Sequence, residues 1–575
     1  MRNSEIAALF YEMADILDVL GVEWEPAAYR KAARSIESLP EPVEDLYERG
    51  GVKALMELAG VGKSIAANME EYLRTGRLKK LEEMRAKVPA AVTVLMGLEG
   101  VGPKRAMLLY KKLGVKSVAD LKKAIAAHKI AKLAGFGVKS EENIAENIKM
   151  FERGHERMLL SEALPLSSEL AARLRKLNEV KQLQVGGSIR RGKETIGDID
   201  ILVTSSKPEK VISAFTMLPE VSRVLAKGPT KATVVLKNNR QADVRVLPDR
   251  EFGAALQYFT GGIEHNVALR RIAIEKGYKL SEYGLFNRKT NAFVAGKTEE
   301  EIYKKLGLRY IEPELRENAG ELEAARKGNL PDLVKLGDIL GDFHMHTKWS
   351  DGSHTIEEMA NEAGRLGYKY VCITDHSKSQ HIAHGLEEKR LEKYVEVVRA
   401  AARKFHDIKI LVGAEVDILA DGSLDYSDDI LKRFDLVLAS VHSGFKQPEA
   451  AMTKRVLRAL ENKHVDILSH PTARMIGVRN PINLNIGEVI RVAAQRGVVL
   501  EVDAAPQRLD LKDVHIREAI KAGCRIAIDT DAHDKNQLRE MEYGVLTARR
   551  GWAEAKDVVN TYPYEKLKKV FRKLK

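Results

Sequence analysis

The sequence predicts a multidomain α/β protein with a helical N-terminal region. Its length of 575 residues allows three to five domains at about 100 to 200 residues per domain. Helical spacing is nearly continuous up to about residue 150, and strand-like runs begin only after about residue 180. Beyond about residue 340, apolar β-like runs alternate with helical stretches, which is the pattern of βα units.

A short glycine motif repeats in the helical region. Residues 58–66 (LAGVGKSIA) and 98–106 (LEGVGPKRA) each place Gly-Val-Gly before a helix, and 133–141 (LAGFGVKSE) is a weaker copy. Glycine lets the backbone approach a phosphate, and the N-terminus of the helix that follows offers unpaired N–H groups. One copy alone would favour an ordinary helical turn. Two copies on a basic chain favour binding to the DNA backbone.

Residues 186–203, GGSIRRGKETIGDIDILV, contain the first candidate catalytic group. On a strand, Asp198 and Asp200 share one face, while the isoleucines between and after them point into the core. Asp243 lies in QADVRVL, another alternating run that can pair alongside. Three carboxylates can hold two Mg²⁺ ions for phosphoryl transfer. The alternative is a solvated acidic edge, which the nearby Gly-Ser and Arg-Arg pairs disfavour.

The turn before these aspartates is suited to phosphate groups. Gly187 and Ser188 can present N–H and hydroxyl donors to terminal phosphates, and Arg191 can add a charged fork. The sequence therefore predicts a nucleotide site beside a metal pair.

The C-terminal part carries a second set of residues able to bind metals. The apolar runs there end in His, Asp or Glu, and in an α/β barrel the C-terminal strand ends form the active face. A lone histidine at a strand end is most often structural, but nine N and O ligands without a thiolate are a set for Zn²⁺, Mn²⁺ or Fe. The nine are His344, His346, Asp351, His376, Glu415, His442, His470, Asp531 and His533.

The composition indicates which partners and which cellular compartment suit the protein. A net charge of +12 and a pI near 9.2 bias its field toward polyanions such as nucleic acid. The only cysteines, Cys372 and Cys524, lie in apolar runs, so we expect them to be buried and unpaired in a reducing cytoplasm. Acidic residues in the first helical stretch argue against a signal peptide, and no apolar run approaches the roughly 18 residues of a membrane span.

The N-terminal half resembles a known family of enzymes. The motif from Gly187 to Asp200, followed by Asp243 and by YFTGGIEHNVALRRIAIEKGY, closely resembles the nucleotidyltransferase core of family X, or DNA polymerase beta-like, polymerases. AYRKAA (28–33) and the Gly-Val-Gly repeats resemble this family's helix-hairpin-helix N-terminal domains. The resemblance covers residues 1 to about 317 and implies an α+β palm that uses Mg²⁺ or Mn²⁺ and dNTPs.

The resemblance also implies roles for single residues. The implied catalytic residues are Asp198, Asp200 and Asp243. The implied nucleotide-binding residues are Gly187, Ser188, Arg191, Gly197, Tyr258, Phe259, Gly261, Asn266 and Arg270, with Tyr258 near the sugar and Asn266 near the base. The expected DNA-binding residues are Tyr29, Arg30, Lys31, Gly60, Gly62, Lys63, Gly100, Gly102 and Lys104.

One position departs from the family pattern. The vertebrate enzyme has a lysine that attacks an abasic sugar in the helix after its first Gly-Val-Gly, and alignment on Gly60 and Gly62 puts Asn68 there. An amide cannot form the imine that lyase chemistry requires. Lys63 is nearby, but position decides attack geometry. We therefore expect lyase activity to be weak or absent.

The nine C-terminal ligands closely resemble those of the PHP (polymerase and histidinol phosphatase) family, a distorted (β/α)7 barrel with three metal ions. The resemblance assigns His344, His346, Glu415 and Asp531 to one ion, Glu415, His442 and His470 to a second, and Asp351, His376 and His533 to a third. It implies 3′–5′ exonuclease, abasic-site or 3′-end processing activity, usually supported by Mn²⁺.

The whole chain thus resembles bacterial and archaeal family X polymerases with a C-terminal PHP domain. The resemblance implies a monomer that fills short gaps in gapped or nicked DNA during repair in the cytoplasm, without a membrane partner. The expected domains are two helix-hairpin-helix domains (1–85 and 86–150), a palm (151–250), a nucleotide-clamping subdomain (251–317), a linker (318–338) and a PHP domain (339–575).

Three other functions share part of this pattern. A template-independent nucleotidyltransferase with a PHP phosphatase would keep the aspartates but would not need the DNA-backbone repeats. A PHP phosphatase for small phosphate esters would keep the nine ligands. A DNA-binding scaffold without activity would be free to lose metal ligands, whereas all twelve stand in this sequence.

Overall fold

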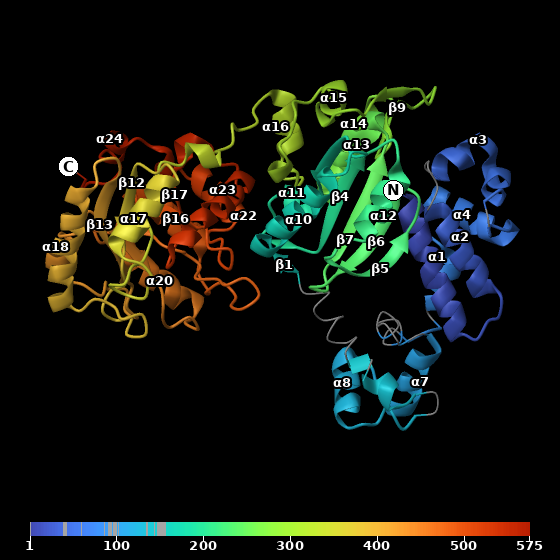
Figure 1. Ribbon diagram of the computed structural model, residues 1–575, viewed down its shortest axis with the longest axis horizontal. Coiled ribbons are helices and arrows are strands. Elements are labelled where there is room, and N and C mark those ends of the chain that lie inside the picture. Colours follow the sequence, from blue (N-terminus) through green and yellow to red (C-terminus); the bar gives the residue numbers. More distant parts are fainter. Residues whose placement is uncertain are drawn as a thin grey trace. The chain divides into compact units, whose positions relative to one another are not determined.

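Figure 1 shows a computed structural model of the chain. It describes residues 2–37, 43–58, 60–85, 87–89, 92, 95, 101, 103–133, 136–142, 144–145 and 157–574. The chain divides into two compact units. The first comprises residues 1–157, 177–182 and 203–249, and the second comprises 158–176, 183–202 and 250–575.

The first unit begins with a helical region, as the sequence predicts. Its described helices are α1 (Arg2–Val19), α2 (Glu25–Glu37), α3 (Val43–Met56), α4 (Lys63–Thr75), α5 (Lys79–Arg85), α7 (Pro103–Leu113) and α8 (Val118–Ala126). The apolar face of α1 is buried, and the ring of Phe10 meets that of Tyr29 on α2 edge-on, with centroids 5.4 Å apart. Burial of this face holds α1 against α2.

The same unit contains a helix and three antiparallel strands. These are α12 (Pro208–Thr216), β5 (Val221–Lys227), β6 (Lys231–Leu236) and β7 (Gln241–Leu247). In the register of β6 and β7, Thr233 lies opposite Asp243. Strands β2 (Gln182–Val185) and β4 (Asp198–Thr204) complete a five-stranded sheet of order β2-β4-β7-β6-β5, drawn in green in Figure 1.

The second unit starts with four elements before and within the glycine-serine motif. They are β1 (Met158–Leu159), α10 (Leu160–Arg175), α11 (Gly187–Arg190) and β3 (Thr195–Ile196), and β1 pairs with β3. Next come α13 (Phe252–Thr260), α14 (Ile263–Glu275) and α15 (Glu299–Lys305), with the small sheet β8 (Tyr278–Ser281), β9 (Gly284–Asn287) and β10 (Phe293–Ala295).

The expected linker contains ordered structure. Helix α16 (Glu321–Lys327) begins at Glu321, which is fully buried and lies 2.6 Å from Nδ1 of His265 on α14. Nε2 of the same histidine lies 3.0 Å from the hydroxyl of Tyr303. The many charged residues of this segment are the reason why the sequence suggested a linker. The carboxylate of Glu321 nevertheless anchors the segment in a buried hydrogen-bond network.

The C-terminal part is a barrel of seven parallel strands, as predicted. They lie in sequence order: β11 (Gly341–Asp342), β12 (Tyr370–Ile373), β13 (Lys409–Asp417), β14 (Leu436–Ser440), β15 (Ile467–Leu468), β16 (Val499–Asp503) and β17 (Ile526–Asp529). Met345, just beyond β11, pairs in parallel with Ala532, just beyond β17, which joins the first strand end to the last. The first and last segments of the barrel therefore meet at its carboxyl-end face.

Helices connect these strands and cover the barrel in Figure 1. They are α17 (Ile356–Arg365), α18 (Glu388–Lys404), α19 (Asp428–Leu431), α20 (Glu449–Leu460), α21 (Ile486–Arg496), α22 (Asp513–Lys521), α23 (Met541–Arg550) and α24 (Tyr564–Leu567). Because both faces of a parallel sheet are covered, β12 and β14 are buried along their whole length. Phe571 joins the apolar cluster around Phe343 and Tyr370.

Two expectations from composition can be compared with the structure. Cys372 and Cys524 are buried and unpaired, as predicted. Among the described residues, no helix is long and apolar enough to cross a membrane.

Candidate active sites

The nine metal-competent residues of the barrel gather at the carboxyl ends of its strands. His344 and His346 follow β11, His376 follows β12, and Glu415 lies near the end of β13. The others follow their strands directly: His442 after β14, His470 after β15, and Asp531 and His533 after β17. Asp351 lies in the turn after His346. The fold thus brings all nine predicted residues to one face.

The side chains form three overlapping groups in which ligand atoms lie within 4.8 Å of one another. The groups are His344, His346 and Asp531; His376, Glu415 and His442; and His346, Asp351, His376 and His533. His470 lies outside these groups, but its Nε2 is 2.9 Å from Oε1 of Glu415. The division differs slightly from the ligand sets that the family resemblance implies, because His346 and His376 each belong to two groups.

Glu415 faces two sides of this cluster with its two oxygens. Oε1 lies 3.3 Å from Nε2 of His442 and 2.9 Å from Nε2 of His470. Oε2 lies 2.7 Å from Nδ1 of His376 and 3.6 Å from Nε2 of His344. A carboxylate in this position can bridge two cations.

The cluster fits cations because its buried polar atoms lack other partners. Within the described residues, Nε2 of His344 and His346, Oε2 of Glu415 and Oδ1 of Asp531 are buried, and their close contacts with one another and with His376 lack hydrogen-bond geometry. Burial opposes ionisation of Glu415, yet the histidines around it, His442 first, hold its pKa well below the usual range. A buried carboxylate that stays ionised among imidazoles, with unused lone pairs beside it, is a donor set for divalent metals.

Two further carboxylates orient the histidines, and the sequence analysis missed both. Oε1 of Glu501 on β16 lies 2.7 Å from Nδ1 of His344, and Oδ1 of Asp417 on β13 lies 2.7 Å from Nδ1 of His442. With Nδ1 donating to a carboxylate, Nε2 keeps its lone pair for a cation. The signal for Asp417 was present, since it is two residues beyond Glu415 and shares its strand face.

The three predicted aspartates of the other site also come together. Burial alternates along the start of β4, where Asp198 is exposed and Ile199 and Ile201 are buried, as predicted. Asp198, Asp200 and Asp243 form a group with carboxylate oxygens within 4.8 Å of one another. The carboxylate of Asp243 is held in place, because it accepts hydrogen bonds from the Thr233 hydroxyl at 2.5 Å and the Gln241 amide at 2.8 Å.

The turn before these aspartates passes close to one of them. Gly187 has φ of 64°, and a Cβ atom there would lie 2.7 Å from Oδ2 of Asp200. Only glycine fits this conformation and this approach. Ser188 follows Gly187 on α11.

The two arginines of the motif have different partners. Arg190 forms a two-pronged ion pair with buried Glu299, at 2.6 and 3.0 Å, and Arg316 binds the same carboxylate at 2.6 Å. Arg191 donates from Nη1 to the carbonyl of Thr260 at 2.5 Å and from Nε to Glu317 at 3.1 Å. Arg190 is therefore held on both prongs by a buried carboxylate, whereas Arg191, the arginine predicted to bind phosphate, meets its carboxylate partner through Nε.

The Arg190–Glu299–Arg316 cluster leads to a stability prediction. We expect Glu299→Gln to lower the free energy of unfolding at pH 7 by about 3 kcal/mol, because it leaves buried Arg316 and half-buried Arg190 without their counter-ion. Burial raises the pKa of Glu299, but Arg316 and Arg190 outweigh it and lower the pKa to about 2. The ionised Glu299 carboxylate therefore contributes fully to the free energy of unfolding above about pH 4.5, and this contribution is lost as the pH falls toward 2. Urea unfolding at pH 7 and pH 3.5 measures this, with exposed Glu300→Gln as control.

This account of the Glu299 cluster would be contradicted if Glu299→Gln lowered the free energy of unfolding more at pH 3.5 than at pH 7. It would also be contradicted if Glu300→Gln lowered that free energy by the same amount.

The side chains expected near the sugar and base of the incoming nucleotide lie at the junction of α13 and α14. Nδ2 of Asn266 donates to the carbonyl of Tyr258 at 2.7 Å, and Oδ1 accepts from the Gln257 amide at 2.8 Å. A Cβ atom on Gly261 would lie 2.4 Å from the same Oδ1. Nε of Arg270 donates to the Asn266 carbonyl at 3.4 Å. Asn266 therefore ties α14 to the last turn of α13, which carries Tyr258 and Phe259.

The first Gly-Val-Gly turn lies against α2. Gly60 has φ of 88°, and a Cβ atom there would lie 2.7 Å from Cγ of Lys31. Gly62 is the N-cap of α4, which starts at exposed Lys63. The fold thus brings the predicted DNA-binding residues Lys31, Gly60 and Gly62 together. Gly100 and Gly102 lie outside the described residues, as does the side chain of Lys104 on α7.

Two of the predicted DNA-binding residues on α2, Tyr29 and Arg30, are less available to a phosphate group. Tyr29 is buried, and its hydroxyl accepts from Asn68 at 2.7 Å and from Lys80 at 3.3 Å. Arg30 pairs with Asp15 at 2.5 Å and Asp18 at 2.7 Å, so a phosphate would compete with two carboxylates.

Asn68 supports a prediction about lyase chemistry. We expect borohydride to trap no strong adduct between the protein and a 5′-deoxyribose phosphate end, because the amide of Asn68 cannot form an imine. Gel analysis of the trapped DNA measures this, and Asn68→Lys is the matched variant that should gain an adduct. A strong wild-type adduct on Lys63 or Lys80 would show that another lysine performs the chemistry.

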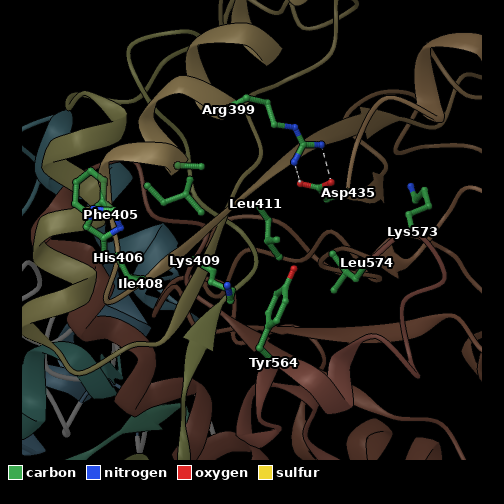
Figure 2. A pocket seen from close by; sticks show the side chains of 12 residues that line it. Arg399, Phe405, His406, Ile408, Lys409, Leu411, Asp435, Tyr564, Lys573 and Leu574 are labelled. Atoms are coloured by element: carbon green, nitrogen blue, oxygen red, sulfur yellow. Dashed lines mark hydrogen bonds and ion pairs between the residues drawn. The ribbon is translucent and has the colours of Figure 1, made fainter.

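A pocket of about 320 Å³ lies away from both sites. Figure 2 shows Lys409, Tyr564 and Lys573 around it, with Arg399 joined to Asp435 by two contacts of 2.6 Å. Lys409 begins β13 and Asp435 precedes β14, so this pocket is at the amino ends of the strands. Active faces of α/β barrels are at the carboxyl ends, where the histidines lie.

Three clustered aspartates beside a Gly-Ser turn, joined to a histidine-lined barrel, define a metal-dependent phosphoryl-transfer enzyme with two separate sites. Family models agree with this division: Helix-hairpin-helix domain (1–78), SAM-like Helix-hairpin-helix tandem (92–150), DNA polymerase beta palm (157–249), DNA polymerase beta thumb (255–317) and PHP domain (342–505) match in order.

Comparison with curated proteins gives relatives of the whole chain and of its parts. The chain is 37% identical over 563 residues to the "DNA polymerase/3'-5' exonuclease PolX" of Bacillus subtilis (strain 168), covering 97% of each chain. It is 26% identical to DNA polymerase lambda of Rattus norvegicus over 55% of this chain and 56% of that one. It is 29% identical to a probable phosphatase of Thermoanaerobacter sp. (strain X514) over 38% of this chain and 89% of that one.

The chain belongs to the family X DNA polymerases that carry a C-terminal PHP domain. It is a DNA polymerase with a PHP phosphoesterase domain, it depends on divalent metal ions, and its substrates are DNA and dNTPs. The predicted fold class is confirmed by the matched families and by the seven-stranded parallel barrel.

Proposed function

We propose that this polymerase fills short gaps in duplex DNA under the direction of the template, and that its PHP domain removes or repairs 3′ ends and abasic sites as a 3′–5′ exonuclease or end-processing enzyme. The observation that carries the proposal is the presence of two candidate metal groups on one chain. Three aspartates cluster in the palm, eight residues cluster at the barrel face, and His470 lies against Glu415 of that cluster. A relative that matches 97% of this chain is named for both activities, polymerase and 3′–5′ exonuclease.

In the polymerase site, Asp198, Asp200 and Asp243 would hold two Mg²⁺ or Mn²⁺ ions. Such ions, when bound, stabilise charge on the attacking and leaving oxygens of an in-line displacement. The chain itself positions the nucleotide: Ser188 and the N–H groups of α11 face the terminal phosphates, and Arg191 supplies a guanidinium to them. The hydrogen bonds to Asp243 from Thr233 and Gln241 fix one carboxylate before substrate arrives.

In the PHP site, the nine residues would hold up to three ions among Zn²⁺, Mn²⁺ and Fe. Bound ions of this kind lower the pKa of a coordinated water and neutralise a phosphodiester. Glu501 and Asp417 fix the tautomers of His344 and His442, so that the free ring nitrogens point into the cluster. The exposed fraction of His533 is 33%, against 1% for Glu415, so substrate would enter on the His533 side.

Several finer features belong to the same proposal. We expect a monomer in the cytoplasm that grips gapped or nicked DNA through backbone phosphates at the Gly-Val-Gly turns. The domain boundaries are those expected from the sequence: 1–85, 86–150, 151–250, 251–317, 318–338 and 339–575. The segment 318–338 would connect the two activities through α16.

The test is a set of reactions on a 5′-phosphorylated duplex with a one-nucleotide gap, with and without dNTPs, in Mg²⁺ and in Mn²⁺. We expect template-matched extension with dNTPs and 3′ shortening without them. Binding should be stronger to a 5′-phosphate gap than to a 5′-hydroxyl gap, and it should weaken steeply with salt while changing little with sequence.

Other outcomes would select other functions. Addition of nucleotides to single-stranded DNA, with no preference for the templated base, would identify a template-independent transferase. Hydrolysis of small phosphate esters with no shortening of DNA would identify a PHP phosphatase. If the protein neither extended nor shortened DNA, the remaining function would be that of a DNA-binding scaffold.

A further inference from the structure

The turn that would bind the triphosphate is attached to the PHP barrel. Nη1 of Arg550, the last residue of α23, donates to the main-chain carbonyl of Arg191 at 3.0 Å. The same Nη1 lies 3.2 Å from Oε1 of Glu317, which is also 3.1 Å from Nε of Arg191. Helix α23 packs on β16 and β17 of the barrel. One PHP side chain therefore holds both the backbone and the guanidinium partner of Arg191.

Glu317 is shared by three cations. Besides Arg191 and Arg550, Nζ of Lys193 lies 2.9 Å from its Oε2. Arg550 is anchored in turn by Asp513 on α22, 2.5 Å away. The side chain of Arg550 is 5% exposed and that of Arg191 is 13% exposed, so solvent screens these interactions only weakly.

Two more contacts join the same turn to the barrel. Gly192 has φ of 60°, and a Cβ atom there would lie 3.2 Å from Cβ of Leu546 on α23. Glu194 pairs with Arg474 of the barrel at 2.8 Å. The turn from Arg191 to Glu194 thus makes contact with the PHP domain through its backbone, its glycine and its last side chain.

We propose that Arg550 of the PHP domain is a positioning residue for nucleotide incorporation. By binding the carbonyl of Arg191 it fixes the turn, and by sharing Glu317 it prevents that carboxylate from neutralising Arg191 fully. Arg191 then keeps charge available for the triphosphate. The inference rests on the proposed role of Arg191 as a phosphate ligand.

The loss of Arg550 should act on binding rather than on chemistry. Without it, the Arg191 carbonyl loses a donor, and Glu317 is left to Arg191 and Lys193. One hydrogen bond to a main-chain group is worth about a factor of five in an equilibrium constant. We therefore expect Arg550→Gln to raise KM for the incoming dNTP by about fivefold in single-nucleotide gap filling, with kcat within about twofold of wild type.

A neighbouring arginine provides a matched control. Arg549, also on α23, joins the barrel to the polymerase part through Glu314 at 2.7 Å and the Val334 carbonyl at 3.0 Å, but it does not contact the turn. Arg549→Gln therefore removes a comparable interdomain ion pair and should leave KM for dNTP unchanged. Thermal unfolding of both variants measures how much each loosens the interface.

The experiment compares wild type, Arg549→Gln, Arg550→Gln and Arg191→Gln in the full chain, with KM and kcat measured for one templated dNTP. We expect Arg191→Gln to raise KM at least tenfold and Arg550→Gln to raise it selectively. Equal KM values in Arg549→Gln and Arg550→Gln, beside a raised KM in Arg191→Gln, would overturn the positioning role alone. An unchanged KM in Arg191→Gln would overturn the phosphate role of Arg191 as well.

Discussion

Asp200→Ala is expected to reduce gap filling by about 1000-fold or more, while binding to gapped DNA stays close to that of wild type. Its carboxylate belongs to a group of three whose oxygens lie within 4.8 Å, so removing it takes a ligand from a two-metal site and with it the stabilisation of transition-state charge. Single-turnover extension of a gapped duplex measures incorporation, and fluorescence anisotropy measures binding.

Asp249→Ala is a suitable control, because that exposed carboxylate forms a surface pair with Lys181 in the same part of the chain. Nuclease activity of the PHP domain should persist in Asp200→Ala. Extension near the wild-type rate in both Asp200→Ala and Asp243→Ala would show that the two-metal assignment is wrong.

Glu415→Ala is expected to remove metal and nuclease activity together, with at least a 1000-fold loss of cleavage in Mn²⁺ without dNTPs. Its two oxygens face different histidines, so the substitution affects two ion positions at once. His533, with a side chain 33% exposed, lies at the edge of the cluster, and His533→Ala should keep part of the metal and of the activity. The substrates are a 3′-recessed duplex and an abasic duplex, and elemental analysis counts the metals.

Exposed Glu392→Ala on α18 serves as the control for Glu415→Ala. Gap filling should stay within about twofold of wild type in Glu415→Ala, because the palm aspartates are untouched. A purely structural metal site would give a lower melting temperature in Glu415→Ala with no wild-type nuclease activity to lose. Cleavage that persists in Glu415→Ala, or that disappears in Asp200→Ala, would contradict separate sites.

The convergence of the candidate ligands of each site could be predicted from the sequence because their spacing follows strand geometry. Asp198 and Asp200 share a face by the two-residue repeat of a strand, and the histidines follow buried β-runs that must end on one face of a barrel. A local pattern was therefore enough to predict their convergence.

The supporting residues could not be predicted in the same way. Glu501 on β16 reaches His344 beyond β11 only in the folded barrel, because the two residues are 157 positions apart in the chain. Asp417 shares a strand face with Glu415, but its partner His442 follows another strand, β14. Arg190 and Arg191 are adjacent in the sequence, yet Glu299 engages one and Glu317 the other, at separations of more than a hundred residues. The charged composition of segment 318–338 suggested a linker. It could not show that Glu321 forms a buried pair with His265, which anchors α16.

The fit of Gly192 against Leu546 has a consequence for evolution and for engineering. A left-handed glycine and an aliphatic side chain packed onto it must change together, because any larger residue at 192 would push against α23. A chimera that joins this palm to a PHP domain from a distant relative would therefore also need a helix surface that fits Gly192. A barrel with a bulkier side chain than Leu546 at this position would be a poor replacement, even with every metal ligand intact.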